Sequence, residues 1–499
     1  ENSTPILVGA GQFTERDVAP SDALPPMGIT AEAAKTALSD TGIGATLARK
    51  IDTIAVVRIF PDSSGRSWLS HPFGRAQNPP RAVARRIGAN PTNAIYSHVG
   101  GNTPQNLVSE MAERIAQNDV DVVLLAGGEA GRTSKIAMRE GIDLNWEEND
   151  EGNQEDRGIG GVFATPHELA HGVGLPIQTY PLFENAIRGQ KGNSIDDHLL
   201  ALGRLFEPFS TVASRNPYAY FQTHRSAAEL ATITDDNHFI SFPYPKYVNA
   251  MDGVNQGAAV IMTSVGKAKE LGIDESKWVF LHGCAEANEK LLISDRVNYY
   301  SSPAMKINGE KALEMADVGI SDINFIDLYS CFPSAVEIAC DSLGLEYDDP
   351  RGLTLTGGLP FFGGPGNNYT MNAIAEMVNK LRAKPSSYGL ITANGGYLSK
   401  HATGIYSSQP TQGNWTRENP AHYQSEINAA ESPVFEEAPK GDATIETYTV
   451  CFDRKGPERG ILIGRLNRNG RRFIANTAAE PGAAKALLDE DSLGRAGSV

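Results

Sequence analysis

Apolar and polar positions alternate along the first part of the chain in blocks that predict strands and helices in turn. Residues 6–8 open a strand, residues 51–59 are rich in β-branched side chains, and residues 122–126 form an unbroken apolar run. Such a run is typical of a strand buried on both faces of a mainly parallel sheet. Thr30 is the expected N-cap of a helix between the first two strands. The pattern predicts an α/β core.

One structural unit occurs twice in the sequence. Residues 93–130 and residues 352–397 each read as an apolar strand, a Gly-Gly corner, an amphipathic helix and a second apolar strand that ends in Gly-Gly. An internal duplication of this kind predicts the architecture before any single residue is interpreted. It also places four glycine-rich corners where two half-domains are expected to meet.

The pattern loosens between the two copies. Residues 146–156 are acidic and are expected to form a solvated loop, whereas residues 197–206 have apolar positions at helical spacing. An insert of this length between core strands is more often a functional cap than an idle loop. After residue 440 the sequence alternates at period two with turn signals, which predicts a small antiparallel barrel or sandwich.

These observations divide the chain into five segments. They are an N-terminal half at 1–130, an inserted loop domain at 131–247, a return to the N-terminal half at 248–277, a C-terminal half at 278–409, and a linker with a C-terminal β domain at 410–499.

Composition and charge exclude several classes of protein. The 499 residues are 40% hydrophobic and 21% charged, with a net charge of −16. Nonspecific nucleic-acid binding is not expected, because no global positive field exists to release counterions. Four cysteines without metal spacing indicate a reduced, cytoplasmic protein. We find no signal-peptide pattern and no run of eighteen apolar residues, so no membrane span is expected.

Five motifs occur in the order of one known family. GVNQGAAV begins at Gly253, DLYSCF at Asp327, GGPG at Gly363 and ANGG at Ala393, and they follow a glycine corner within YSHVGGNTPQ. Together they resemble the thiolase superfamily of acyltransferases, close to its sterol-carrier-protein-2-like branch, over residues 5–408. The added C-terminal β domain makes the chain similar to thiolase-like protein type 1.

The resemblance implies an α/β fold: a duplicated five-layer αβαβα core with an inserted loop domain and a C-terminal OB-like domain. It implies coenzyme A (CoA) or an acyl-CoA as ligand or substrate, in lipid metabolism, with no metal and no further cofactor. Because thiolases usually dimerise through the core and an added domain can block that edge, we expect a monomer or a homodimer.

The side chains of thiolase chemistry are absent from the matching positions. The resemblance places Gly100 at the nucleophilic cysteine, Gly364 at the histidine and Ala393 at the second cysteine. Without a thiolate and its proton-transfer partners, the covalent acyl-enzyme route cannot run. The main chain keeps its donors, so the N–H groups of Gly100 and Gly395 are expected to form an oxyanion hole.

Three side chains near these positions are candidate catalytic groups. Tyr329 is either a general acid or base, or a tyrosine that closes a strand at the core edge. His98 is either a replacement base or a half-buried histidine bonded to a backbone carbonyl. Asn394 either orients a carbonyl or water, or simply tolerates a left-handed turn.

Thiolases bind CoA with their insert domain, and the insert of this chain is rich in basic residues. The candidate CoA contacts are Arg132, Lys135, Arg188, Arg215, Met251 and Gly253. Basic side chains suit phosphate, although solvated surface charge explains any one of them equally well.

Two classes of function remain open. The first is an enzyme that acts on a CoA thioester by noncovalent carbon–carbon bond chemistry, of retro-aldol or condensation type. The second is a catalytically inactive acyl-CoA-binding or scaffold protein of lipid metabolism.

Overall fold

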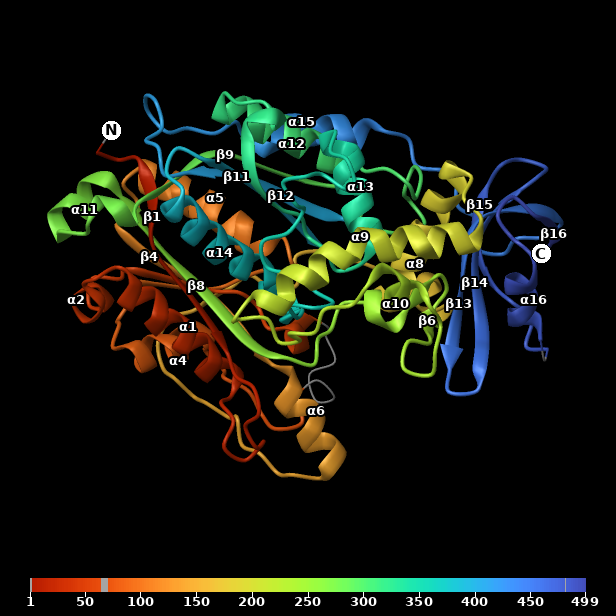
Figure 1. The fold of residues 1–499 in the computed structure, drawn as a ribbon, viewed down its shortest axis with the longest axis horizontal. Helices are drawn as coiled ribbons and strands as arrows, with labels where there is room; N and C mark the ends of the chain where they lie inside the picture. The colour runs from red at the N-terminus through yellow and green to blue at the C-terminus, as the bar shows by residue number, and fades with distance from the viewer. Residues whose placement is uncertain (1, 64–70, 481) are drawn as a thin grey trace.

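The computed structural model describes residues 2–63, 71–480 and 482–499. Its main sheet has the strand order β10-β11-β12-β9-β1-β8-β4-β2-β3-β5 (Figure 1). The strands are β1 (Pro5–Thr14), β2 (Thr53–Val56), β3 (Asn93–Tyr96), β4 (Val122–Ala130), β5 (Glu155–Asp156), β8 (Asn255–Ser264), β9 (Val279–Asn288), β10 (Ile323–Asp327), β11 (Tyr388–Gly395) and β12 (Lys400–Ser407). Within the described residues, only two residue pairs join β1 to β9, so the sheet divides between these two strands into two halves.

Helices form three layers around the two halves. The helices α5 (Thr103–Ala116) and α14 (Tyr369–Ala383) contact both halves and lie between them. Their apolar faces fill a shared core that includes Val108, Met111 and Ile374. The outer layers contain α1 (Pro26–Asp40), α2 (Gly44–Ala48), α4 (Pro79–Ile87) and α11 (Val265–Leu271) on one side, and α12 (Pro303–Ala316) and α13 (Pro333–Leu343) on the other. The predicted duplicated α/β core is confirmed.

Two local predictions are wrong. Thr30 is not an N-cap, because α1 already begins at Pro26 and the Thr30 hydroxyl donates to the Pro26 carbonyl at 2.8 Å. The second copy of the repeat also lacks its first strand. There the Asp327 carboxylate accepts the N–H groups of Leu355 and Thr356, at 2.7 and 3.1 Å, so these amides are not available to a sheet ladder.

The acidic segment 146–156 is not a free solvated loop. Trp146 packs edge-on against Phe73, with ring centroids 5.4 Å apart. The Glu148 carboxylate pairs with the guanidinium groups of two arginines on α4. The segment then ends in β5, which pairs with β3 and covers that edge of the sheet. The negative charge of this segment is visible in the sequence, but its pairing with the arginines of α4 is visible only in the structure.

The insert is mainly helical and shares a sheet with the C-terminal domain. Its helices are α6 (Gly131–Glu140), α7 (Pro166–Ala170), α8 (Pro176–Lys191), α9 (Ile195–Arg215) and α10 (Ala227–Ala231), followed by β6 (Phe239–Ser241) and β7 (Tyr244–Pro245). The C-terminal elements are β13 (Asp442–Asp453), β14 (Gly456–Leu466), β15 (Arg472–Asn476), α16 (Ala483–Asp489) and β16 (Ala496–Ser498). Figure 1 shows them at one end of the molecule, beside α8.

The second sheet is open. Pairing within the described residues runs β15-β14-β13-β6-β7, with β16 on β13, and the OB-like character of this domain stays a prediction. The linker before it contains a helix, α15 (Pro420–Ala429), which contacts β9. Among the described helices, none has the length and apolar character that crossing a bilayer requires.

Candidate functional site

The corner that corresponds to the thiolase nucleophile lies between β3 and α5. The Gly100 N–H donates to the Asn367 side-chain oxygen at 3.1 Å. The Asn367 amide group in turn donates to the Arg58 carbonyl at 2.8 Å. The first of the two expected oxyanion donors is therefore already paired within the protein.

Side chains also fill the space around the corner. A Cβ atom added at Gly100 or at Gly395 would overlap the Asn102 side-chain oxygen, and one added at Gly101 would overlap the Tyr329 hydroxyl. One donor of the predicted oxyanion hole, the Gly100 N–H, is therefore not free in this structure. The Asn102 side-chain oxygen lies against both Gly100 and Gly395.

The other two vacated positions are packed as well. Ala393 is buried in β11 opposite Ala402 of β12. Gly364 is buried, and its N–H donates to the Met251 carbonyl at 2.9 Å. Neither position carries a reactive side chain.

Tyr329 and Asn394 both lie behind this corner. Tyr329 is buried, and burial raises its pKa well above 10, so it is a neutral phenol at physiological pH. The Asn394 amide donates to the Tyr180 hydroxyl of α8 at 3.0 Å. Because Asn394 has no positive φ, the left-handed-turn interpretation is wrong. Its side chain joins β11 to the insert.

No cysteine replaces the missing nucleophile. All four cysteines are free and buried. Burial raises the pKa of Cys284 to about 11 and that of Cys331 to about 12. Since the thiolate is the reactive form, neither thiol is a nucleophile at neutral pH.

His98 lies in a polar cleft beside the corner, with a volume of about 490 Å³. Although His98 is exposed to solvent, partial desolvation of its ring by the cleft walls, together with the charges of Lys400 and Arg157, lowers its pKa. Lys400 donates to the Val99 carbonyl at 2.8 Å, and burial lowers its pKa to about 8. Sequence reasoning missed Lys400, because a lysine at the start of a strand carries no signal of burial.

The candidate CoA contacts fall into two groups. Arg132 and Lys135 are exposed on α6, and Lys135 pairs with Asp252, next to Met251 and Gly253. The other two candidates, Arg188 on α8 and Arg215 on α9, lie away from this group.

Arg215 is exposed as the last residue of α9. Arg188 is fully buried, and its guanidinium donates twice to the Asp491 carboxylate, both at 2.8 Å. A phosphate cannot reach Arg188, so that prediction is wrong: this arginine joins α8 to the C-terminal domain.

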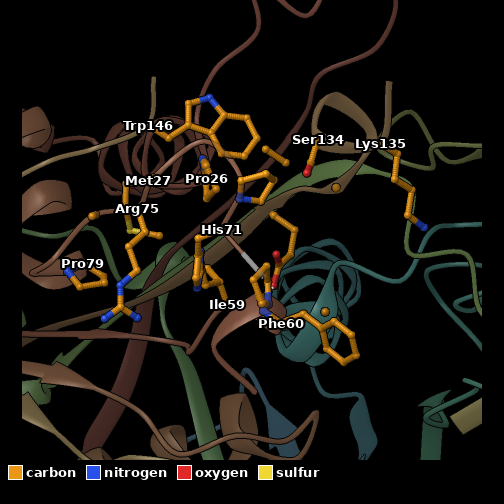
Figure 2. Close-up of a pocket in the computed structure, with 18 of the residues that line it drawn as sticks. Pro26, Met27, Ile59, Phe60, His71, Arg75, Pro79, Ser134, Lys135 and Trp146 are labelled. Carbon is orange, nitrogen blue, oxygen red and sulfur yellow. The ribbon is translucent and has the colours of Figure 1, made fainter. Parts of the chain in front are cut away.

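Lys135 and its partner Asp252 border a mainly apolar pocket of about 170 Å³ (Figure 2). Its walls come from α6, the start of α1 and the segment around Phe60, and its apolar lining includes Met27, Ile59, Met138 and Trp146. Glu129, at the end of β4, is the buried acidic group in this lining. Burial raises the pKa of Glu129 to about 8, although its carboxylate accepts the Phe60 N–H at 2.6 Å.

A second acid behind the pocket has the opposite protonation state. Burial opposes the ionisation of Asp62, but hydrogen bonds from His71 and Tyr96, together with the charge of Arg75, outweigh it and lower its pKa to about 2. At neutral pH the pocket therefore combines a protonated Glu129, which can donate a hydrogen bond, with an ionised Asp62, which is already paired.

The duplicated layered core defines a thiolase-fold protein, and Gly100, Gly364 and Ala393 stand where the resemblance places the thiolase Cys, His and Cys. The family model for the additional C-terminal domain of thiolase-like protein type 1 matches residues 422–499. A crystal structure of a monomeric SCP2-thiolase like protein type 1 from Mycobacterium smegmatis is 41% identical, with 99% of this chain and 96% of that chain covered and a TM-score of 0.84. The chain belongs to the SCP2-thiolase-like protein type 1 family.

A more distant structure shares the fold alone. The Ltp2-ChsH2(DUF35) aldolase is 18% identical, with 81% of this chain and 98% of that chain covered and a TM-score of 0.57. No curated protein matches the sequence.

Proposed function

We propose that this chain binds an acyl-CoA thioester and does not catalyse thiolysis. The loss of catalysis is supported by the occupied Gly100 amide, the filled corner and the un-ionised cysteines. Thiolysis requires an acylated thiol, and none of the buried thiols is placed or ionised for that role.

The pocket beside α6 is the observation that carries the binding proposal. Its apolar walls suit a short acyl chain, because ligand sites are mostly apolar with a few placed polar groups. The protonated Glu129 can donate to the thioester carbonyl. Lys135 lies at the mouth of the pocket, and Arg132 is exposed three residues earlier on the same helix, where phosphates of CoA would remain in solvent. Displacing Asp252 from its exposed pair with Lys135 costs only about 1 kcal/mol or less.

The test is a binding titration followed by Trp146 fluorescence and by the melting temperature. CoA, acetyl-CoA and hexanoyl-CoA are compared, and hexanoyl-CoA is expected to bind most tightly because its chain fills the apolar pocket. Lys135→Glu and Arg132→Glu should each weaken binding by about tenfold, since each replaces a charge-assisted contact by repulsion. Arg215→Glu is the matched control on the other insert helix. Equal weakening by the control, or no binding of any CoA ester, would refute the proposal.

The second candidate is noncovalent carbon–carbon bond chemistry on a CoA thioester. It is favoured by the neutral Tyr329 phenol, whose hydroxyl stands over Gly101 at the corner. Turnover of 3-hydroxyacyl-CoA that is lost in Tyr329→Phe, with acyl-CoA affinity retained, would establish this enzyme function instead.

We further propose that the protein acts as a monomer in the cytoplasm. The β5 segment covers the β3 edge of the sheet, and the 41% identical relative is monomeric. Four buried free thiols suit a reducing compartment. Light scattering should give a mass near 53.5 kDa; a concentration-independent dimer would contradict the monomer.

A further inference from the structure

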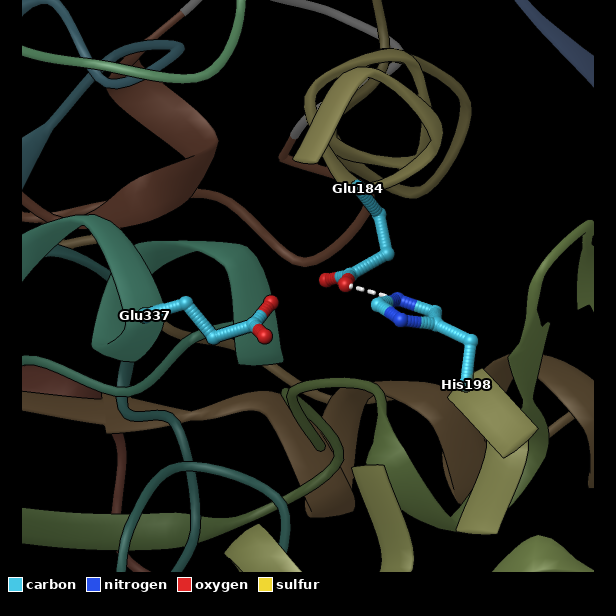
Figure 3. Close-up of side chains that lie close together, drawn as sticks. All are labelled: Glu184, His198 and Glu337. Carbon is cyan, nitrogen blue, oxygen red and sulfur yellow. Dashed lines mark hydrogen bonds and ion pairs between the residues drawn. The ribbon is translucent and has the colours of Figure 1, made fainter. Parts of the chain in front are cut away.

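Three helices bring Glu184, His198 and Glu337 together away from the corner and the acyl pocket (Figure 3). Glu184 comes from α8, His198 from α9 and Glu337 from α13. One ligand atom from each lies within 4.8 Å of the others. All three side chains are buried, at 0%, 1% and 2% exposure. A buried set of two carboxylates and one imidazole is the donor set that first-row divalent metals prefer.

In each carboxylate, one oxygen accepts a hydrogen bond from a neighbouring side chain, and the other oxygen is left for a metal ion. The Tyr244 hydroxyl donates to Glu184 Oε2 at 2.6 Å, and the Lys191 ammonium donates to Glu337 Oε1 at 2.7 Å. The second oxygen of Glu184 lies 2.5 Å from His198 Nε2. The second oxygen of Glu337 has no partner among the residues that the structure describes. Outer partners of this kind fix the ligands of protein metal sites.

The two nitrogens of the His198 ring face different partners. Nε2 faces the Glu184 carboxylate. Nδ1 lies 3.5 Å from the Asn193 side-chain amide. Turning that amide makes it an acceptor for Nδ1–H, which leaves the lone pair of Nε2 directed at the two glutamates.

The cluster needs a further positive species when both carboxyl groups are ionised. Lys191 then compensates only one of the two buried negative charges, and the other is costly unless it is compensated as well. A divalent cation provides that compensation and satisfies the free Glu337 oxygen at the same time. A proton shared between the two glutamates is the competing explanation.

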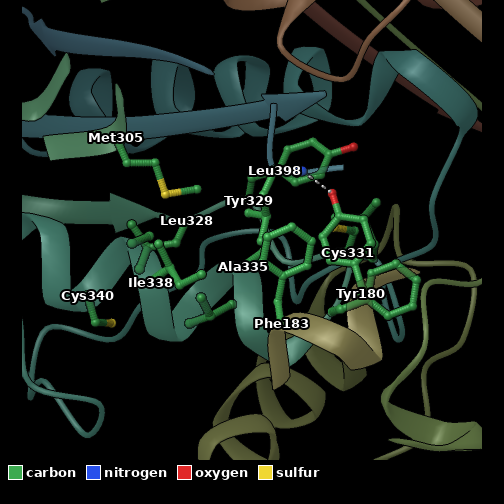
Figure 4. Packing of buried hydrophobic residues seen from close by; sticks show 14 of the residues in the cluster. Tyr180, Phe183, Met305, Leu328, Tyr329, Cys331, Ala335, Ile338, Cys340 and Leu398 are labelled. Atoms are coloured by element: carbon green, nitrogen blue, oxygen red, sulfur yellow. Dashed lines mark hydrogen bonds between the residues drawn. The ribbon is translucent and has the colours of Figure 1, made fainter. Parts of the chain in front are cut away.

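We propose that Glu184, His198 and Glu337 bind one divalent transition-metal ion, with zinc as the first choice for this mixed nitrogen and oxygen donor set. The ion would join the insert helices α8 and α9 to α13. Figure 4 shows that α8 and α13 already pack together here, with Phe183 and Tyr180 of α8 close to Ala335 of α13. The metal therefore holds the insert against the helix that follows the DLYSCF motif.

The experiment uses the untagged full chain. Metal content is measured by elemental analysis after purification and again after chelation and reloading with Zn²⁺. Co²⁺ titration of the chelated protein is followed by visible absorption. We expect about one metal ion per folded chain, with Zn²⁺ raising the melting temperature. Glu337→Gln and His198→Gln should lower the affinity by about tenfold or more, whereas Glu286→Gln, which alters the half-buried partner of Arg417, should leave it unchanged.

Two results would overturn the proposal. The first is folded wild-type protein that takes up no stoichiometric Zn²⁺ and gives no Co²⁺ absorption. That measurement needs no variant, so a variant that fails to fold does not obscure it. The second is metal uptake that is unchanged in folded Glu337→Gln, which would place the ion elsewhere. In the first case the glutamates share a proton.

Discussion

Replacing Glu129 by glutamine should stabilise the protein at neutral and alkaline pH. The folded pKa of Glu129 is about 8, against 4.5 for a free glutamate, because the carboxyl is buried. The folded state therefore binds a proton that the unfolded state releases above pH 4.5. Stability is highest below that value and falls as pH rises towards about 8. With about 1.4 kcal/mol for each pH unit, the loss is about 5 kcal/mol over the whole range and about 3 kcal/mol at pH 7.

Urea unfolding at pH 5, 7 and 8.5 measures this effect. Glu129→Gln keeps the shape of the side chain and removes the charge, so its free energy of unfolding should match the wild type near pH 5. At pH 7 it should exceed the wild type by up to about 3 kcal/mol. Glu140→Gln is the matched control, because Glu140 is exposed on α6 beside the same pocket.

Parallel pH profiles of wild type and Glu129→Gln would refute the reasoning, because they would show that Glu129 is ionised in the folded state. Lower stability of the variant at every pH would show that the carboxylate is paired. The same variant bears on binding. Glutamine retains a donor for a thioester carbonyl, so acyl-CoA affinity should survive in Glu129→Gln and fall in Glu129→Leu.

The remaining predictions concern the corner, the domain contact and the polar cleft. Gly100→Cys should not restore thiolysis and should lower the melting temperature, since Gly100 has φ of 135° and a Cβ would overlap Asn102. Robust thiolysis by this variant would show that the assignment of positions 100, 364 and 393 to the thiolase Cys, His and Cys is wrong. Asp491→Ala should cost about 3 kcal/mol of unfolding free energy and more than Arg188→Met, because only the former leaves a buried guanidinium unpaired; the reverse order in urea unfolding would contradict it. Carbamylation of Lys400 by cyanate, followed by mass spectrometry, should rise near pH 8, well below the pH needed for the half-buried Lys311, whose pKa is raised by Glu418 and Glu314; identical pH profiles would contradict the effect of burial.

The sequence determined the layered core and the residue types at the positions that the resemblance assigns to thiolase chemistry. The apolar run at 122–126 became β4, and the helices of the two repeated units became α5 and α14. Both signals are local, because the periodicity of a strand or helix is written in consecutive residues. The absence of cysteine and histidine at positions 100, 364 and 393 is likewise visible without coordinates.

Only the tertiary structure decided what occupies those positions and which charges are free. The partner of the Gly100 amide lies 267 residues away at Asn367, and the partner of Arg188 lies 303 residues away at Asp491. Glu184 and Glu337 come from the insert and from the second half of the core. Side-chain pairs at such separations depend on how layers pack against each other. No periodicity along the chain records this packing, so an exposed arginine and a buried one cannot be told apart until the fold brings their neighbours into place.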